Sequence, residues 1–98
     1  MIQKKFVKSR NITKVSFEFN ELDADSIALI ADFTNWQPIE VPKLKNGKWK
    51  LEQDLDPGQS YEFRYVLSKG NDTWFDNDES ADRFVSNAHG SQNAVLDC

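Results

Sequence analysis

Hydrophobic and polar residues alternate over most of this chain, and this period of two is the feature that most restricts its fold. In residues 13–20, Val15 and Phe17 fall on one side of an extended backbone, and polar residues fall on the other. The same alternation recurs in residues 48–56 and 60–68. It is the period of a β-strand with one buried face. Because no segment has an amphipathic helical stripe of useful length, the sequence predicts an all-β fold.

Turn signals separate the extended segments. Asn46-Gly47 suits a tight hairpin, Pro57-Gly58 suits a type II turn, and residues 69–72 suggest a longer loop. About eight short strands in 98 residues are typical of one immunoglobulin-like β-sandwich domain of about seven to nine strands, spanning residues 1–98. The predicted strands are residues 3–7, 13–20, 26–31, 48–56, 60–68, 73–76, 83–85 and 93–97.

The charge balance excludes several classes of function. The net charge is −4, and the one basic cluster (Lys4, Lys5, Lys8 and Arg10) is expected to be the solvated edge of a first strand. Without a basic stripe, we expect no nucleic-acid partner, and we expect no membrane partner. The start of the chain has no apolar run, and Cys98 is the single cysteine, so no internal disulfide is possible. These features predict a cytoplasmic protein.

The three tryptophans lie in different sequence contexts. Trp49 shares a face with Leu51 in an alternating strand and is predicted to be buried. Trp36 lies in a polar loop and Trp74 lies near a turn, so both are predicted to be exposed; Arg64 is on the outward side of its strand. An exposed flat ring suits the apolar face of a pyranose, and a nearby guanidinium suits its hydroxyls. The residues alone favour this interpretation no more than one in which both rings cover the ends of the sandwich.

Around these residues the sequence resembles the family-48 carbohydrate-binding modules. That family includes the early-set domains of isoamylases and branching enzymes, and the glycogen-binding domain of the AMP-activated protein kinase β subunit. The resemblance covers about residues 12–97 and implies an early-set, immunoglobulin-like β-sandwich. The segments that carry it are Ala31-Asp32-Phe33-Thr34-Asn35-Trp36, Gly47-Lys48-Trp49, Pro57-Gly58, Phe63-Arg64-Tyr65, Trp74 and Gly90-Ser91-Gln92-Asn93-Ala94-Val95.

The resemblance also implies a function and a set of site residues. In glucan-binding members of the family, the two loop tryptophans stack on sugar, which implies this role for Trp36 and Trp74. The strand cation and the final-loop amide hydrogen-bond to the sugar, which implies this role for Arg64 and Asn93, with Ser91 as a helper. The implied function is non-catalytic binding of an α-glucan such as starch or glycogen.

Two alternatives remain open at this stage. The domain can be a spacer or protein-interaction domain that kept the fold and lost the sugar. Its Trp36 and Trp74 face would then contact a protein such as a glucan-metabolising enzyme. Asn93 has its own alternative, because an Asn that enters a strand often ties a loop to the backbone.

Catalytic and metal sites find little support in the sequence. Residues 76–82 are acidic but lack the Gly and the terminal Glu of a calcium-binding EF-hand loop. His89 is the only histidine and Cys98 the only thiol, which argues against zinc and against a Cys-His nucleophile. A domain of this size has little room for a glycosidase cleft. We therefore expect no enzyme activity, no cofactor and no metal.

Overall fold

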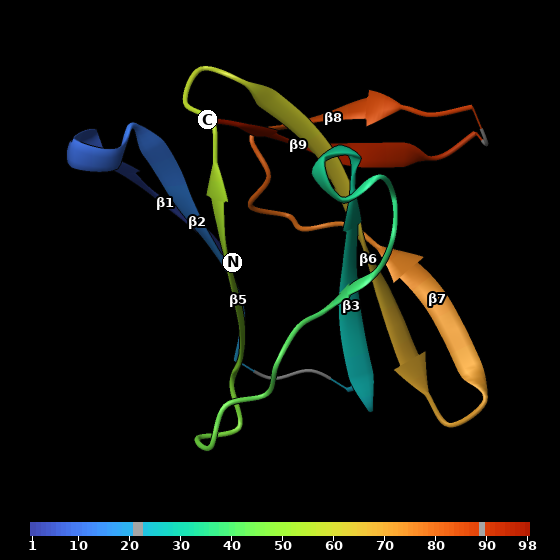
Figure 1. Cartoon of the computed structure of the whole chain (residues 1–98). Coiled ribbons are helices and arrows are strands. Elements are labelled where there is room, and N and C mark those ends of the chain that lie inside the picture. Colours follow the sequence, from blue (N-terminus) through green and yellow to red (C-terminus); the bar gives the residue numbers. More distant parts are fainter. Residues whose placement is uncertain (21–22, 89) are drawn as a thin grey trace.

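The computed structural model describes residues 1–20, 23–88 and 90–98, and these form two antiparallel sheets (Figure 1). Eight of the nine strands in the described residues overlap the eight predicted ones, so the all-β prediction is confirmed. The ninth, β4, was not predicted. The smaller sheet contains β1 (Ile2–Val7), β2 (Ile12–Phe19) and β5 (Trp49–Leu55), in that order. The larger sheet contains β4 (Ile39–Glu40), β3 (Ser26–Ala31), β6 (Ser60–Lys69), β9 (Gln92–Asp97) and β8 (Arg83–Ser86), with β7 (Asp72–Asp76) also paired to β6.

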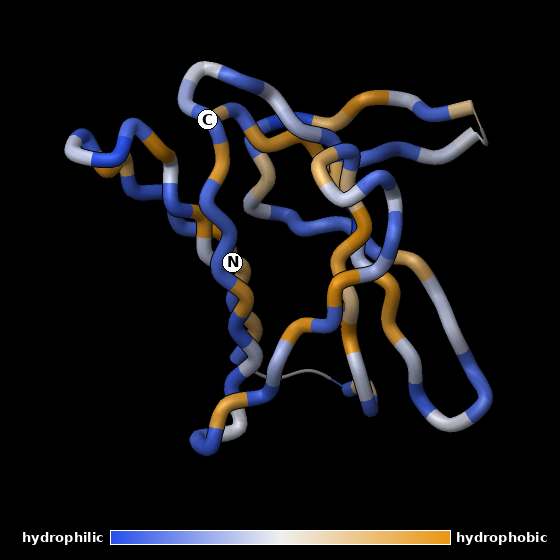
Figure 2. The backbone as a smooth tube through the Cα atoms, viewed as in Figure 1, coloured by the Kyte–Doolittle hydropathy of each residue, from blue (hydrophilic) through white to orange (hydrophobic). Residues whose placement is uncertain are grey.

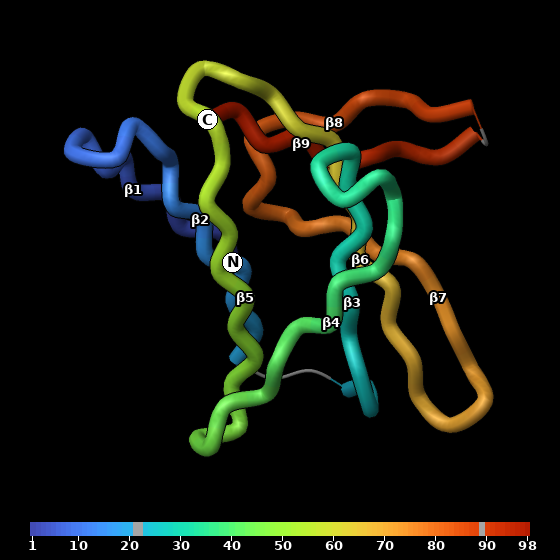
Figure 3. Tube along the Cα trace, in the orientation of Figure 1, coloured from blue at the N-terminus to red at the C-terminus, as the bar shows by residue number. Residues whose placement is uncertain are grey.

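Strand β6 is the longest strand and organises the larger sheet. Along one edge it pairs with β3. Along the other edge its first half pairs with β9, and its second half pairs with β7. In the trace of Figure 3, the chain leaves β3, turns over at its end and returns beside it as β4 before crossing to the smaller sheet. β6 therefore has β3 along one edge, and β9 and β7 along the two halves of its other edge.

The inner faces of both sheets share one hydrophobic core. Phe17 of β2 and Phe63 of β6 meet edge-on with ring centroids 5.5 Å apart, and Tyr65 joins them at 5.7 Å from Phe63. Trp49 is buried in the same core, as predicted. The core forms because hydrophobic and hydrophilic residues alternate within the strands, as Figure 2 shows along the chain. The two packed sheets are a β-sandwich, while immunoglobulin-like connectivity stays a prediction.

A buried carboxylate ties the segment after β7 to this core. Asp78 accepts a hydrogen bond from the Tyr65 hydroxyl at 2.7 Å and from the Ser80 hydroxyl at 2.6 Å. Burial opposes ionisation of Asp78, but the hydrogen bonds from Ser80 and Tyr65 outweigh it and hold the pKa of this carboxyl below its ordinary value. Burial, together with the negative charge of Asp78, raises the pKa of Tyr65. The pair is therefore a neutral phenol bonded to an ionised carboxylate.

The loop expected at residues 69–72 is in fact a tight hairpin. Lys69 pairs with Asp72, so only Gly70 and Asn71 form the turn between β6 and β7. Gly70 has a φ of +59°, which primed hairpin turns require and which glycine adopts without strain. The turn fixes the register of β7 against β6, and this register decides which of its side chains reach the outer face.

The first strand lies at the edge of the smaller sheet, as its cluster of lysines predicted. β1 is an edge strand, and it carries the predicted lysines Lys4 and Lys5. Lys4 donates to both carboxylate oxygens of Asp82, at 2.9 and 2.7 Å. In the described part of the chain, no helix has the length and apolar character needed to cross a lipid bilayer.

Candidate ligand-binding site

The candidate site lies on the outer face of the larger sheet. Phe63 and Tyr65 of β6 point into the core, so Arg64 between them points outward, as predicted. Ile30 of β3 lies directly opposite Arg64 in the antiparallel register. Because directly opposed residues share a face, Ile30 and Arg64 form the floor of the site.

Trp36 is brought over this floor by a strained turn after β3. A short 3₁₀ turn at Asp32–Thr34 leads into Asn35 and Trp36, whose φ angles are +55° and +59°. Left-handed backbone costs a non-glycine residue about 1–2 kcal/mol. The Trp36 amide donates to the Ala31 carbonyl at 2.8 Å, which closes the turn. The indole is left 41% exposed, so the prediction that Trp36 is exposed is confirmed.

The rest of the same motif fastens this turn to the domain. Asp32 accepts a hydrogen bond from the Glu62 amide at 3.0 Å, which joins the turn to β6. Phe33 turns toward the core and meets Tyr61 edge-on at 5.5 Å. The two rings of this motif thus have different environments. Phe33 packs against the core, and Trp36 is exposed.

Strand β7 contributes Phe75 to the site, and not Trp74. Phe75 lies opposite Val66 on the outer face, and its ring is 4.8 Å from the Arg64 guanidinium carbon. Trp74 lies opposite Leu67, which is buried, so its indole is on the other face of the sheet.

The prediction that Trp74 is exposed is confirmed, at 37%, but the expectation that it shares a face with Trp36 is corrected. The physical reason is the register fixed by the two-residue turn. A one-residue difference in register exchanges the two faces of a strand. The Gly70-Asn71 pair was the available signal, because a two-residue hairpin there pairs Leu67 with Trp74.

A network of polar side chains forms one wall of the site. Asn87 donates from Nδ2 to Ser91 Oγ at 2.9 Å and to Asn93 Oδ1 at 3.1 Å. Arg64 donates to Ser91 Oγ at 3.4 Å, and Asn93 donates to Glu62 at 3.3 Å. Asn93 is only 9% exposed, and its amide group is bonded within the protein. This bonding favours the alternative in which Asn93 ties the β8–β9 loop to the sheet.

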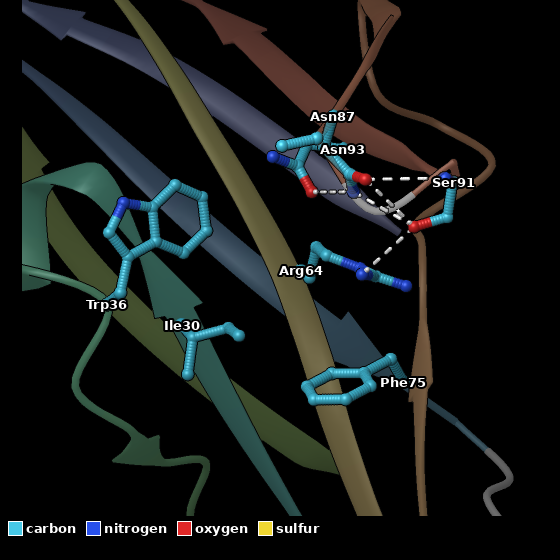
Figure 4. A pocket seen from close by; sticks show the side chains of 8 residues that line it. Ile30, Trp36, Arg64, Phe75, Asn87, Ser91 and Asn93 are labelled. Atoms are coloured by element: carbon cyan, nitrogen blue, oxygen red, sulfur yellow. Dashed lines mark hydrogen bonds between the residues drawn. The ribbon is translucent and has the colours of Figure 1, made fainter.

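Together these side chains line a hollow of about 750 Å³, called here the ring pocket. Figure 4 shows Trp36 on one side, Phe75 and Ser91 on the other, and the two asparagines above Arg64. Of the five residues implied by the resemblance, the structure places Trp36, Arg64, Ser91 and Asn93 in this pocket and leaves Trp74 outside it. Sequence reasoning missed half of the lining. The full lining is Ile30, Trp36, Arg64, Phe75, Asn87, Ala88, Ser91 and Asn93.

Arg64 differs from the other two arginines of the chain. Arg10 pairs with Asp54 at 3.2 Å, and Arg83 pairs with Asp97 at 3.1 Å. Among the described residues, no carboxylate lies within ion-pairing distance of Arg64, and its buried Nε has no acceptor. Within the described residues, the terminal nitrogens of Arg64 make one side-chain hydrogen bond, at 3.4 Å to Ser91 Oγ. The guanidinium therefore has hydrogen-bonding capacity to offer a ligand.

Neither a relative nor a metal site in the described residues gives this pocket an identity. No protein-family model matches the chain, and no curated protein matches its sequence. Within residues 1–20, 23–88 and 90–98, no group of three His, Cys, Asp or Glu side chains is placed to hold a metal ion. His89 lies outside the described residues.

Proposed function

We propose that the ring pocket binds the sugar rings of an α-glucan such as starch or glycogen, without catalysis. The observation that carries the proposal is the arrangement of Trp36 and Phe75. Both rings are exposed, at 41% and 55%, and both line one hollow beside Arg64. A pyranose has an apolar face that stacks on aromatic rings and an edge of hydroxyls that need polar partners. The resemblance to family-48 carbohydrate-binding modules supports the same ligand.

The polar side of the pocket suits a neutral ligand rich in hydroxyls. The terminal nitrogens of Arg64, which within the described residues bond only Ser91 Oγ, suit hydroxyl oxygens as acceptors. Ser91 exchanges hydrogen bonds with Asn87, which holds its hydroxyl in place beside Arg64. Because the polar wall is already bonded within the protein, it is preorganised and loses little freedom on binding.

The proposed role is targeting or anchoring to glucan. An open pocket with few desolvated contacts predicts weak binding, with a Kd of about 10–500 μM, equivalent to roughly −4.5 to −7 kcal/mol. A cytoplasmic location is part of the proposal, and the single cysteine supports it.

One observation favours the second candidate, a protein-interaction domain. All five residues of β7 are exposed, and within the described residues this strand pairs only with β6. Trp74 presents an indole on the face of β7 away from the ring pocket. An extended segment of a partner, such as a glucan-metabolising enzyme, would add to this edge as a further strand.

Titration with maltoheptaose tests the first proposal and separates it from the second. We expect Trp36→Ala to cost about 1–3 kcal/mol of affinity, by analogy with bases that stack on aromatic side chains. Arg64→Ala should cost about 1 kcal/mol, since its bonds to sugar replace bonds to water. The measurement is calorimetry or NMR shift titration. No response of the wild type at millimolar sugar would contradict the proposal and favour the protein partner.

A further inference from the structure

A second hollow lies beside the ring pocket on the same face of the larger sheet. Its volume is about 410 Å³. Its centre is the pair of Ala28 on β3 and Val66 on β6, which is the next outward-facing pair after Ile30 and Arg64. Successive pairs on one face are separated by two residues, or about 6.6–6.8 Å. The lining residues are Ser26, Ile27, Ala28, Pro38, Glu40, Val66 and Ser68.

The segments that line the ring pocket continue past the second hollow. On one side, the segment that carries Trp36 continues to Pro38 and Glu40, and Glu40 lies opposite Ala28. On the other side, Phe75 of β7 lines the ring pocket and also lies opposite Val66 in the second hollow. The row Glu40, Ala28, Val66 and Phe75 therefore crosses four strands on one face. The floors of the two hollows are therefore successive residue pairs along β3 and β6.

The second hollow has the chemistry of a weaker sugar subsite. Its floor of Ala28 and Val66 is apolar and low, so a ring can lie against it. Ser26 and Ser68 supply hydroxyls, and the exposed Glu40 supplies an acceptor for sugar hydroxyls. The ring pocket contributes a cation and the second hollow contributes an anion. A ligand that crosses both can accept hydrogen bonds at Arg64 and donate them at Glu40, as the neutral hydroxyls of a glucan do.

We infer that a bound glucan chain continues from the ring pocket along β3 and β6 into the second hollow. This inference rests on the proposed function and adds a second subsite to it. At the end of β3 away from Ala28, the Asp32–Thr34 turn crosses toward β6 and is held there by the hydrogen bond from the Glu62 amide to Asp32. The chain therefore leaves the pocket toward Ala28 and Val66. Long chains make contacts there that short chains do not reach.

The test compares maltotriose with maltoheptaose on a variant that fills only the second hollow. Ser68→Gln places a larger side chain there and touches no residue of the ring pocket lining. Ser16→Gln is the matched control, because Ser16 is half-buried on β2 between two buried residues, on the outer face of the other sheet. We expect Ser68→Gln to weaken maltoheptaose by about fivefold, equivalent to one net hydrogen bond, and to leave maltotriose unchanged. Ser16→Gln should leave both affinities unchanged.

A second measurement on the wild type makes the test independent of the folding of any variant. The backbone amide signals of Ala28, Glu40 and Val66 should shift with maltoheptaose and stay unmoved with maltotriose. Equal affinity of the wild type for both sugars, or an unchanged affinity of Ser68→Gln for maltoheptaose, would overturn the inference while maltotriose binding upheld the proposed function. Equal weakening of both sugars by Ser68→Gln would also overturn it. If neither sugar binds the wild type, both proposals fail.

Discussion

Aromatic rings lie on both faces of the larger sheet around β6, but in opposite environments. On the inner face, Phe63 and Tyr65 are buried and meet edge-on with each other and with Phe17. On the outer face, Arg64 lies beneath Phe75, and that ring is 55% exposed. The inner rings pack against one another, and the outer rings line the ring pocket. Aromatic content by itself therefore says nothing about binding; the face on which a ring lies decides.

The comparison extends to the tryptophans. Trp49 lies in the core, and Trp36 stands at the ring pocket on a strained backbone. Strained backbone is concentrated at functional sites in proteins, which supports the proposed role of Trp36. If the two faces are as different as their burial indicates, substitutions on them should separate stability from affinity.

The largest expected effect is on stability at the inner face. Trp49→Ala should lower the free energy of unfolding by about 3–5 kcal/mol, because it leaves a cavity in the core. Trp36→Ala should lower it by less than about 1 kcal/mol, since that side chain faces solvent. Chemical denaturation of both variants measures the two values. Equal losses would make Trp36 a packing residue and remove the distinction between the faces.

A second expected effect concerns the buried carboxylate behind Tyr65. Asp78→Asn should lower the free energy of unfolding by about 1–3 kcal/mol at neutral pH, because it disrupts hydrogen bonds made to a buried charged acceptor. The folded state lowers the pKa of Asp78, so its contribution is present above the unfolded value of about 3.9 and is lost as pH falls through the folded value.

Denaturation midpoints between pH 7 and pH 2 measure this dependence. The wild type should lose more stability than Asp78→Asn as the pH falls below about 4. Asp72→Asn, at an exposed position on β7, is the control and should keep the wild-type pH dependence. Parallel curves for the wild type and Asp78→Asn would show that Asp78 does not contribute to the acid sensitivity.

The smallest expected effect separates two neighbours on one exposed strand. Phe75→Ala should weaken maltoheptaose binding by about 1 kcal/mol, at the low end of the range for aromatic stacking. Trp74→Ala should change it by less than about 0.5 kcal/mol, because its indole lies on the other face. Calorimetric titration of the two variants measures both. The opposite ranking would place the sugar on the far side of β7.

Local pattern predicted the strands because each strand needs one buried face, and a period of two marks that face within a few residues. It placed Trp49 inside and Arg64 outside, and the structure confirms both. It missed β4, which has two residues and no alternation to detect. The sequence motif also located the exposed Trp36, since no alternating neighbours in its polar loop offered it burial.

The sequence by itself determined which residues share a face within one strand, and so the β class and the core. Ser91 and Asn93 were implied by the family resemblance alone. Only the tertiary structure decided which faces of neighbouring strands meet. The Gly70-Asn71 turn sets the register of β7, which brings Phe75 to the ring pocket and turns Trp74 away. The tertiary structure likewise placed Asn93 in hydrogen bonds with Glu62 and Asn87. Register depends on hydrogen bonds between strands, and a period of two along one strand carries no information about them.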